Sequence, residues 1–109
     1  MRADIAAFAR YWNEERFFEA HETLEPRWMR ERDPGLQGLI QLAAALHHLQ
    51  RGNLRGARTM LGRALPRLLR EGNAACELDQ ALLAAYGREV LGQIDLRPPS
   101  ELIGERPPL

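Results

Sequence analysis

Apolar residues recur along most of this chain with the three- and four-residue spacing that is typical of amphipathic α-helices. This spacing predicts five helices, over residues 4–14, 16–32, 36–50, 54–70 and 77–93. The breaks between them carry turn and capping residues, such as Asp33-Pro34-Gly35 and Gly52-Asn53. The pattern predicts an all-α, compact bundle of about five helices that forms one domain over residues 1–96. A Pro-rich tail, residues 97–109, is expected without regular structure, either draped over the bundle or frayed.

The third helix, residues 35–51 at its widest, is predicted to be the buried centre of the bundle, because no residue from Pro34 through Gln50 is charged. Its wide apolar arc includes His47, which we expect to be a core residue with its hydrogen bonds satisfied. The opposite side is polar but neutral and consists of Gln37, Gln41, Ala44, Ala45 and His48. An exposed face in this chain would carry Glu and Arg, so this stripe is expected to face another polar surface.

That other surface is predicted on the helix that begins at Arg16. His21 and Glu25 lie one turn apart inside its apolar arc, and Glu22 lies at the edge of the arc. The opposite side, with Glu19, Thr23, Arg27 and Arg30, is expected to face solvent. Pro26 removes one helical hydrogen bond and predicts a kink or a break near Glu22.

A carboxylate among apolar residues must be protonated, paired or bound to a cation. One hypothesis is therefore a divalent metal site, with Zn, Fe or Mn held by His21, Glu22, Glu25 and His48. A related hypothesis is acid–base catalysis, in which Glu25 is the base and His21 or His48 its partner. The residue order matches neither the Glu-x-x-His motif of di-iron proteins nor the His-Glu-x-x-His motif of zinc peptidases.

The main alternative is a non-catalytic binding module. A groove between the second and third helices would bind a peptide, a protein or a small ligand through Trp28, Gln37 and Gln41. Similar apolar positions in the helices at 17–28 and 54–65 resemble the paired helices of tetratricopeptide repeats, which supports this hypothesis. A polar network that only fixes the helix register is a further alternative. The spacing of Arg16 and His21 also fits a helical nuclease motif, although weakly.

The formal net charge is zero, and no apolar run approaches the roughly 18 residues of a membrane span, so neither a nucleic-acid nor a membrane partner is expected. A single cysteine, Cys76, and the absence of a leader-like N-terminus predict a cytoplasmic protein. Two tryptophans in a short chain predict an exposed apolar patch and a homodimer.

The fourth helix is strongly basic. Residues 51–70 hold six arginines and no acidic residue. We expect a solvated face whose arginines pair with acidic neighbours. An anion- or RNA-binding surface is the less favoured alternative, because few aromatic residues are interleaved for base stacking.

Several of these features together resemble the domain-of-unknown-function family numbered 309. The resemblance covers roughly residues 8–70 and is carried by the segments Arg16-Phe17-Phe18-Glu19-Ala20-His21-Glu22-x-Leu24-Glu25-x-x-Trp28, Gln37-Gly38-Leu39-Ile40-Gln41 and Gly52-Asn53-x-x-Gly56-Ala57, with His48 between the last two. It implies a small all-helical intracellular domain without an established activity, substrate or cofactor. The motif residues of the family map onto His21, Glu22, Glu25, Trp28, Gln41, His48, Asn53 and Gly56. Asn53 is thereby added to the candidate binding residues.

Overall fold

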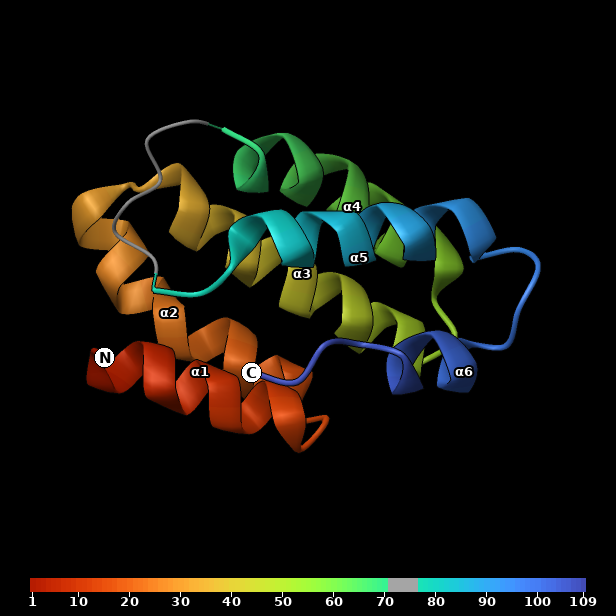
Figure 1. The fold of residues 1–109 in the computed structure, drawn as a ribbon, viewed down its shortest axis with the longest axis horizontal. Coiled ribbons are helices and arrows are strands. Elements are labelled where there is room, and N and C mark those ends of the chain that lie inside the picture. Colours follow the sequence, from red (N-terminus) through yellow and green to blue (C-terminus); the bar gives the residue numbers. More distant parts are fainter. Residues whose placement is uncertain (71–76) are drawn as a thin grey trace.

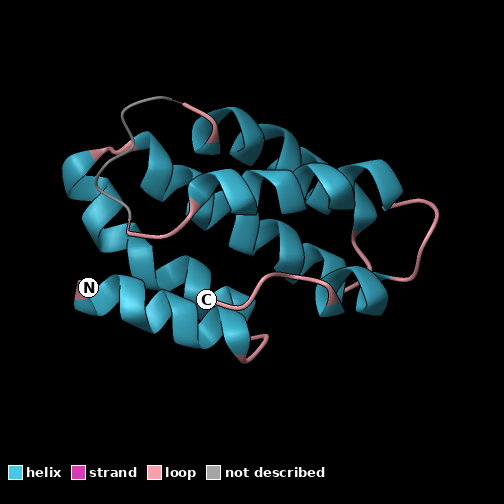
Figure 2. Cartoon of the chain, viewed as in Figure 1, coloured by secondary structure: helices cyan, strands magenta, loops and turns pink. Residues whose placement is uncertain are grey.

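Six helices and no strands are found in the computed structural model, which describes residues 1–70 and 77–109 (Figures 1 and 2). They are α1 (Ala3–Asn13), α2 (Phe17–Glu31), α3 (Pro34–Gln50), α4 (Leu54–Leu68), α5 (Gln80–Gln93) and α6 (Pro99–Gly104). The predicted all-α bundle is confirmed. The break predicted at Glu71-Gly72-Asn73, and Cys76, lie outside the described residues.

The central position of α3 is also confirmed, since α3 packs against α2, α4 and α6. Ten of its residues are buried, including Leu39, Leu42 and Leu46. Ala45 is buried as well, although we placed it on the neutral polar stripe. Asp33 caps the helix by accepting a hydrogen bond from the Leu36 N–H at 3.0 Å, and Pro34 starts the first turn.

The helix α2 runs without a break from Phe17 to Glu31, so the proline at position 26 does not end it. Arg32 closes it in the left-handed conformation, with φ of 53°. One residue of its predicted solvent face was placed wrongly: Arg27 is only 2% exposed. Helix α1 covers this side of α2, and Asp4 of α1 lies 3.1 Å from Arg27 Nε.

The basic helix α4 is shorter than predicted and ends at Leu68. Among the described residues, one of its arginines shows the expected pairing with a carboxylate. Arg58 forms an ion pair with Asp95, and Arg67 donates a hydrogen bond to Gln37 at 2.8 Å. The other four arginines of this segment are exposed and form no ion pair within residues 1–70 and 77–109; they are Arg51, Arg55, Arg63 and Arg70.

The C-terminal tail is ordered along the bundle, and it contains a helix, α6, where we expected no regular structure. Leu102 and Ile103 of α6 belong to the hydrophobic core. The last residues lie against the end of α1, as Figure 1 shows. There, the indole N–H of Trp12 donates to the Pro107 carbonyl at 2.8 Å, and the Arg106 guanidinium donates to the Trp12 carbonyl at 3.0 Å.

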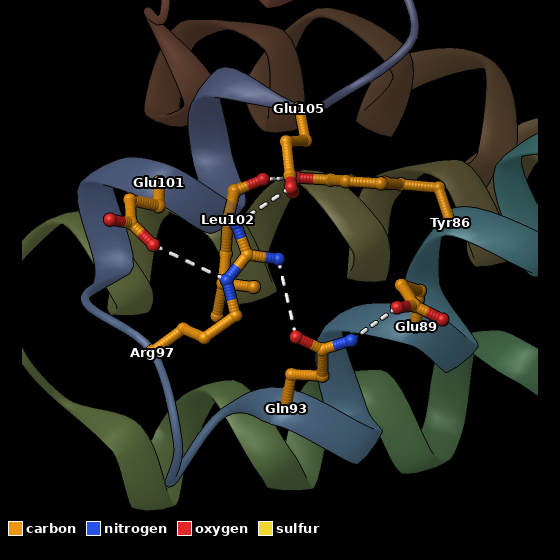
Figure 3. A network of polar contacts seen from close by, with 7 residues as sticks. All are labelled: Tyr86, Glu89, Gln93, Arg97, Glu101, Leu102 and Glu105. Carbon is orange, nitrogen blue, oxygen red and sulfur yellow. Dashed lines mark hydrogen bonds and ion pairs between the residues drawn. The ribbon is translucent and has the colours of Figure 1, made fainter.

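A polar network joins α5 to α6 (Figure 3). Arg97, in the connecting loop, donates hydrogen bonds to Glu105 at 2.7 Å and to Gln93 at 3.2 Å. The contact with Arg97 holds the pKa of Glu105 below its usual value. The buried hydroxyl of Tyr86 donates to the Leu102 carbonyl at 2.7 Å, and burial raises the pKa of Tyr86. The network fixes α6 against α5.

No helix in the described ranges has both the length and the apolar character needed to cross a bilayer.

Candidate functional site

A groove runs along the line where α2 and α3 meet. It consists of three adjoining hollows of about 470, 220 and 200 Å³. The first and second share Phe18 and His47, and the second and third share His21, so the three form one continuous surface. We call this surface the α2–α3 groove. The neutral stripe of α3 contributes Gln37, Gln41, Ala44 and His48 to its wall. The groove therefore lies between the two helices where the sequence predicted it.

The His21 and Glu25 side chains meet on the α2 side of the groove. His21 Nδ1 lies 3.2 Å from Glu25 Oε1, and both side chains are partly exposed. The contact has the distance of an ion pair, but Nδ1 has no partner with hydrogen-bond geometry. Glu22 is exposed and lines none of the three hollows. Of the three candidate residues on α2, His21 and Glu25 therefore lie at the groove and Glu22 does not.

Two buried polar atoms near Trp28 lack partners. The indole N–H of Trp28 and the amide oxygen Oε1 of Gln41 are shielded from solvent, and neither has a hydrogen-bond partner among residues 1–70 and 77–109. Both residues line the hollow that also contains His21 and Glu25. Gln37 lines the same hollow, but its Oε1 accepts the hydrogen bond from Arg67. A buried donor or acceptor without a partner costs about 1–3 kcal/mol, so these atoms would gain from a bound polar group.

A second constellation fixes His48. The side-chain oxygen of Asn53 accepts from the Gly56 N–H at 2.9 Å and caps α4. This orientation turns the Asn53 NH₂ group toward His48 Nδ1, at 3.2 Å. Because an amide N–H must donate, Nδ1 accepts and the proton of the neutral ring resides on Nε2. In this arrangement His48 Nε2 is a hydrogen-bond donor, and Asn53 contacts His48 but lines none of the three hollows.

Gly56 leaves room for this arrangement. A Cβ at this position would lie 2.7 Å from Asn53 Nδ2 and 2.9 Å from His48 Nδ1. We expect Gly56→Ala to lower the free energy of unfolding by about 2 kcal/mol, because it disrupts the cap and the His48 contact together. Urea denaturation measures this change.

Gly62→Ala, in the same helix, is the matched control, because nothing lies within 4 Å of an added Cβ there. It should stabilise the protein by about 0.5–1 kcal/mol. Equal effects of the two substitutions would contradict the proposed steric role of Gly56.

His47 was expected in the core, but the structure places it at the groove, where it lines two hollows. Its ring lies 5.4 Å from that of Phe18. Burial is the main cause that lowers the pKa of His47. The charges of Arg51, His48 and His21 lower it further, against a smaller opposite effect of Glu19. His47 is thus neutral at pH 7 and available for hydrogen bonding. The sequence feature that could have placed His47 at the groove is its position next to His48.

The four proposed metal ligands do not converge. His21 and His48 share one hollow, Glu25 lies in the next, and Glu22 is outside the groove. Among the described residues, no group of three or more His, Cys, Asp or Glu side chains is arranged to hold a metal ion. Arg16, the arginine of the helical nuclease motif considered above, forms ion pairs with Glu14 and Glu19.

One hollow was not anticipated. It has a volume of about 250 Å³ and lies between α5, α6 and the tail, with Leu82, Tyr86, Val90 and Leu102 among its lining residues. Its lining is mainly apolar. It was not predicted from the sequence, because the tail that forms one of its walls was expected without regular structure.

Comparison with known proteins assigns the chain to a family. The model of the family described as "Domain of unknown function (DUF309)" matches residues 5–60. An uncharacterized protein of Aquifex aeolicus (strain VF5) is 30% identical over 105 residues, which are 92% of this chain and 32% of that protein. The uncharacterized protein YpuF of Bacillus subtilis (strain 168) is 35% identical over 88 residues, 72% of this chain and 49% of that protein.

The chain thus spans between a third and a half of the length of these relatives. No solved structure matches it significantly. The family model covers just over half of the chain, including α2, α3 and the Asn53–Gly56 cap. The chain therefore belongs to the DUF309 family of domains of unknown function.

Proposed function

We propose that this domain is a binding module whose α2–α3 groove accommodates an amphipathic helix of a protein partner. The observation that carries the proposal is a pair of buried polar atoms without hydrogen-bond partners among the described residues, in a groove that combines aromatic and apolar side chains with polar and charged ones. These atoms are the Trp28 indole N–H and the Gln41 amide oxygen. A partner that offers both an apolar face and a few polar groups would satisfy them.

The length of the groove supports a helix as the ligand. The groove follows α3 from Gln37 to Arg51, the residue that caps its C-terminal end, which corresponds to about 21 Å at the helical rise. Four turns of a partner helix would cover this length, as in other grooves that bind helices. Ala44 at the middle of the groove leaves room for close approach, and Phe18, which is 48% exposed, offers an aromatic anchor beside it.

A second candidate function is an acid–base or metal-dependent site, as the sequence also suggested. The observation in its favour is the 3.2 Å contact between His21 and Glu25, because a carboxylate beside an imidazole orients the ring for proton transfer. His48, with its proton on Nε2, would be a donor and His21 the base. Of the four proposed metal ligands, only His21 and Glu25 lie side by side and could bind one divalent ion together.

The experiment is a selection from a displayed library of amphipathic helical peptides, followed by titration of the selected peptides. The Trp12→Phe variant serves as host, because Trp28 is then the only tryptophan and reports on the groove by its fluorescence. We expect Phe18→Ala to weaken peptide binding about tenfold or more, since buried aromatic anchors dominate such interfaces.

Leu82→Ala is the matched control. Leu82 is 50% exposed, close to the value for Phe18, but it lines the hollow between α5 and α6. It should leave binding unchanged. A larger effect of Leu82→Ala than of Phe18→Ala, or a library that yields no binder, would contradict the proposal. Stoichiometric Zn²⁺ binding that is lost in His21→Ala would favour the second candidate instead.

A further inference from the structure

Four arginines beside α4 that form no ion pair with a described residue make up a second surface, which meets the α2–α3 groove only at Arg51. We infer that this surface, which we call the α4 arginine stripe, binds the phosphate backbone of a double-stranded nucleic acid. The stripe consists of Arg51, Arg55, Arg63 and Arg70, all exposed. This inference revises the sequence-based expectation that acidic neighbours would pair with these side chains.

The position of the arginines on the helix makes the surface continuous. At roughly 100° per residue, Arg55, Thr59, Gly62, Arg63 and Pro66 share one side of α4. The other sides of α4 pack against α3 and α5, so this side is the outer one (Figure 1). Arg55 and Arg63 lie about 12 Å apart along the axis. Arg51 and Arg70 follow in sequence just beyond the two ends of the helix, and Arg51 also lines the α2–α3 groove.

No carboxylate of residues 1–70 or 77–109 forms an ion pair with the arginines of the stripe. Every acidic residue of the chain lies outside residues 51–70. Of the arginines that flank the stripe, Arg58 is neutralised by Asp95. The zero net charge of the whole chain therefore conceals a strong separation of charge, and the local field at α4 attracts anions.

The residues between the arginines favour phosphate over other anionic partners. Thr59, Gly62 and Pro66 are small and exposed, and the space at Gly62 is open, so a flat polyanion can approach the guanidinium groups closely. No aromatic residue stands on this side of α4, which argues against base stacking with a single strand. The stripe also lacks the apolar anchors that protein interfaces and membrane-bound helices use. Arginine forms bidentate hydrogen bonds with phosphate.

The test is fluorescence anisotropy with a short labelled RNA duplex, and with DNA of the same sequence, at about 50 and 200 mM salt. Four phosphate contacts predict that log K falls with log salt with a slope of about −3 to −4. In the double variant Arg55→Gln/Arg63→Gln, we expect binding at the lower salt concentration to weaken about tenfold and the slope to decrease by about 2. The duplex that binds more tightly identifies RNA or DNA as the partner.

The matched control is Arg10→Gln/Arg30→Gln, which removes the same charge from α1 and α2, where both arginines are exposed. It should change affinity less than about twofold. Equal losses in the two double variants, no binding of either duplex, or tighter binding to phosphatidylserine vesicles or polyglutamate would overturn the inference. Circular dichroism of both variants establishes that they are folded.

Discussion

Replacing Trp12 by alanine is expected to lower the free energy of unfolding by about 4 kcal/mol, the largest effect that we predict for a single substitution. Trp12 is fully buried, and its ring contacts Phe8, Phe17 and Tyr86, with centroid distances of 6.1, 5.6 and 6.2 Å. Through its indole N–H it also holds the C-terminal tail, at the Pro107 carbonyl. The substitution therefore leaves a cavity and releases the tail together.

Chemical denaturation measures the loss, and hydrogen exchange of the Leu109 amide reports on the tail, because this amide donates to Asn13 at 2.8 Å. Trp12→Phe is the control: it retains an aromatic ring but loses the hydrogen bond to Pro107, so we expect a smaller loss together with faster exchange of Leu109. A loss below about 1 kcal/mol for Trp12→Ala would contradict the central position of this residue.

The second large effect is expected at the buried ion pair between α1 and α2. Asp4→Ala should lower the free energy of unfolding by about 3 kcal/mol, because it leaves the buried guanidinium of Arg27 without its nearest counter-charge. Arg27 Nε lies 3.1 Å from Asp4 Oδ2 and 3.6 Å from Glu31 Oε2. The geometry is that of an ion pair without aligned hydrogen bonds, since all three guanidinium nitrogens lack hydrogen-bond partners in the part of the chain that the structure describes. The Asp4 side chain is 26% exposed, which keeps the expected effect below the top of the usual range.

A double-mutant cycle isolates this interaction. Asp4→Ala/Arg27→Leu should recover most of the lost stability, because the uncompensated charge is removed and an apolar side chain takes its place. Glu31→Ala is the control, and it should cost less than about 1 kcal/mol since Glu31 is largely exposed. Additive effects of Asp4→Ala and Arg27→Leu would show that the two side chains do not interact.

Part of the candidate site could be predicted from the sequence. His21, Glu25, Trp28 and Gln41 were expected to face each other, because helical spacing places them on two faces that both needed a partner, and they do share the α2–α3 groove. Glu22 was included because it lies at the edge of the apolar arc of its helix, and Asn53 because the family resemblance carries it. The structure leaves Glu22 at the exposed surface and shows Asn53 as the residue that positions His48. A helical wheel cannot separate these cases, since it gives the direction of a side chain but not the atoms that it meets.

The sequence by itself determined the all-α fold, the central place of α3 and the ends of most helices, because periodicity, caps and breakers act over a few residues. Only the tertiary structure decided what each face meets. It buried Arg27 against α1, ordered the tail along α1 and α5, and left four arginines of α4 without carboxylate partners in the described part of the chain. These outcomes depend on contacts between residues that are distant in sequence, and no local pattern encodes the partner of a charged side chain. Burial and charge pairing at these positions are therefore properties of the packed bundle.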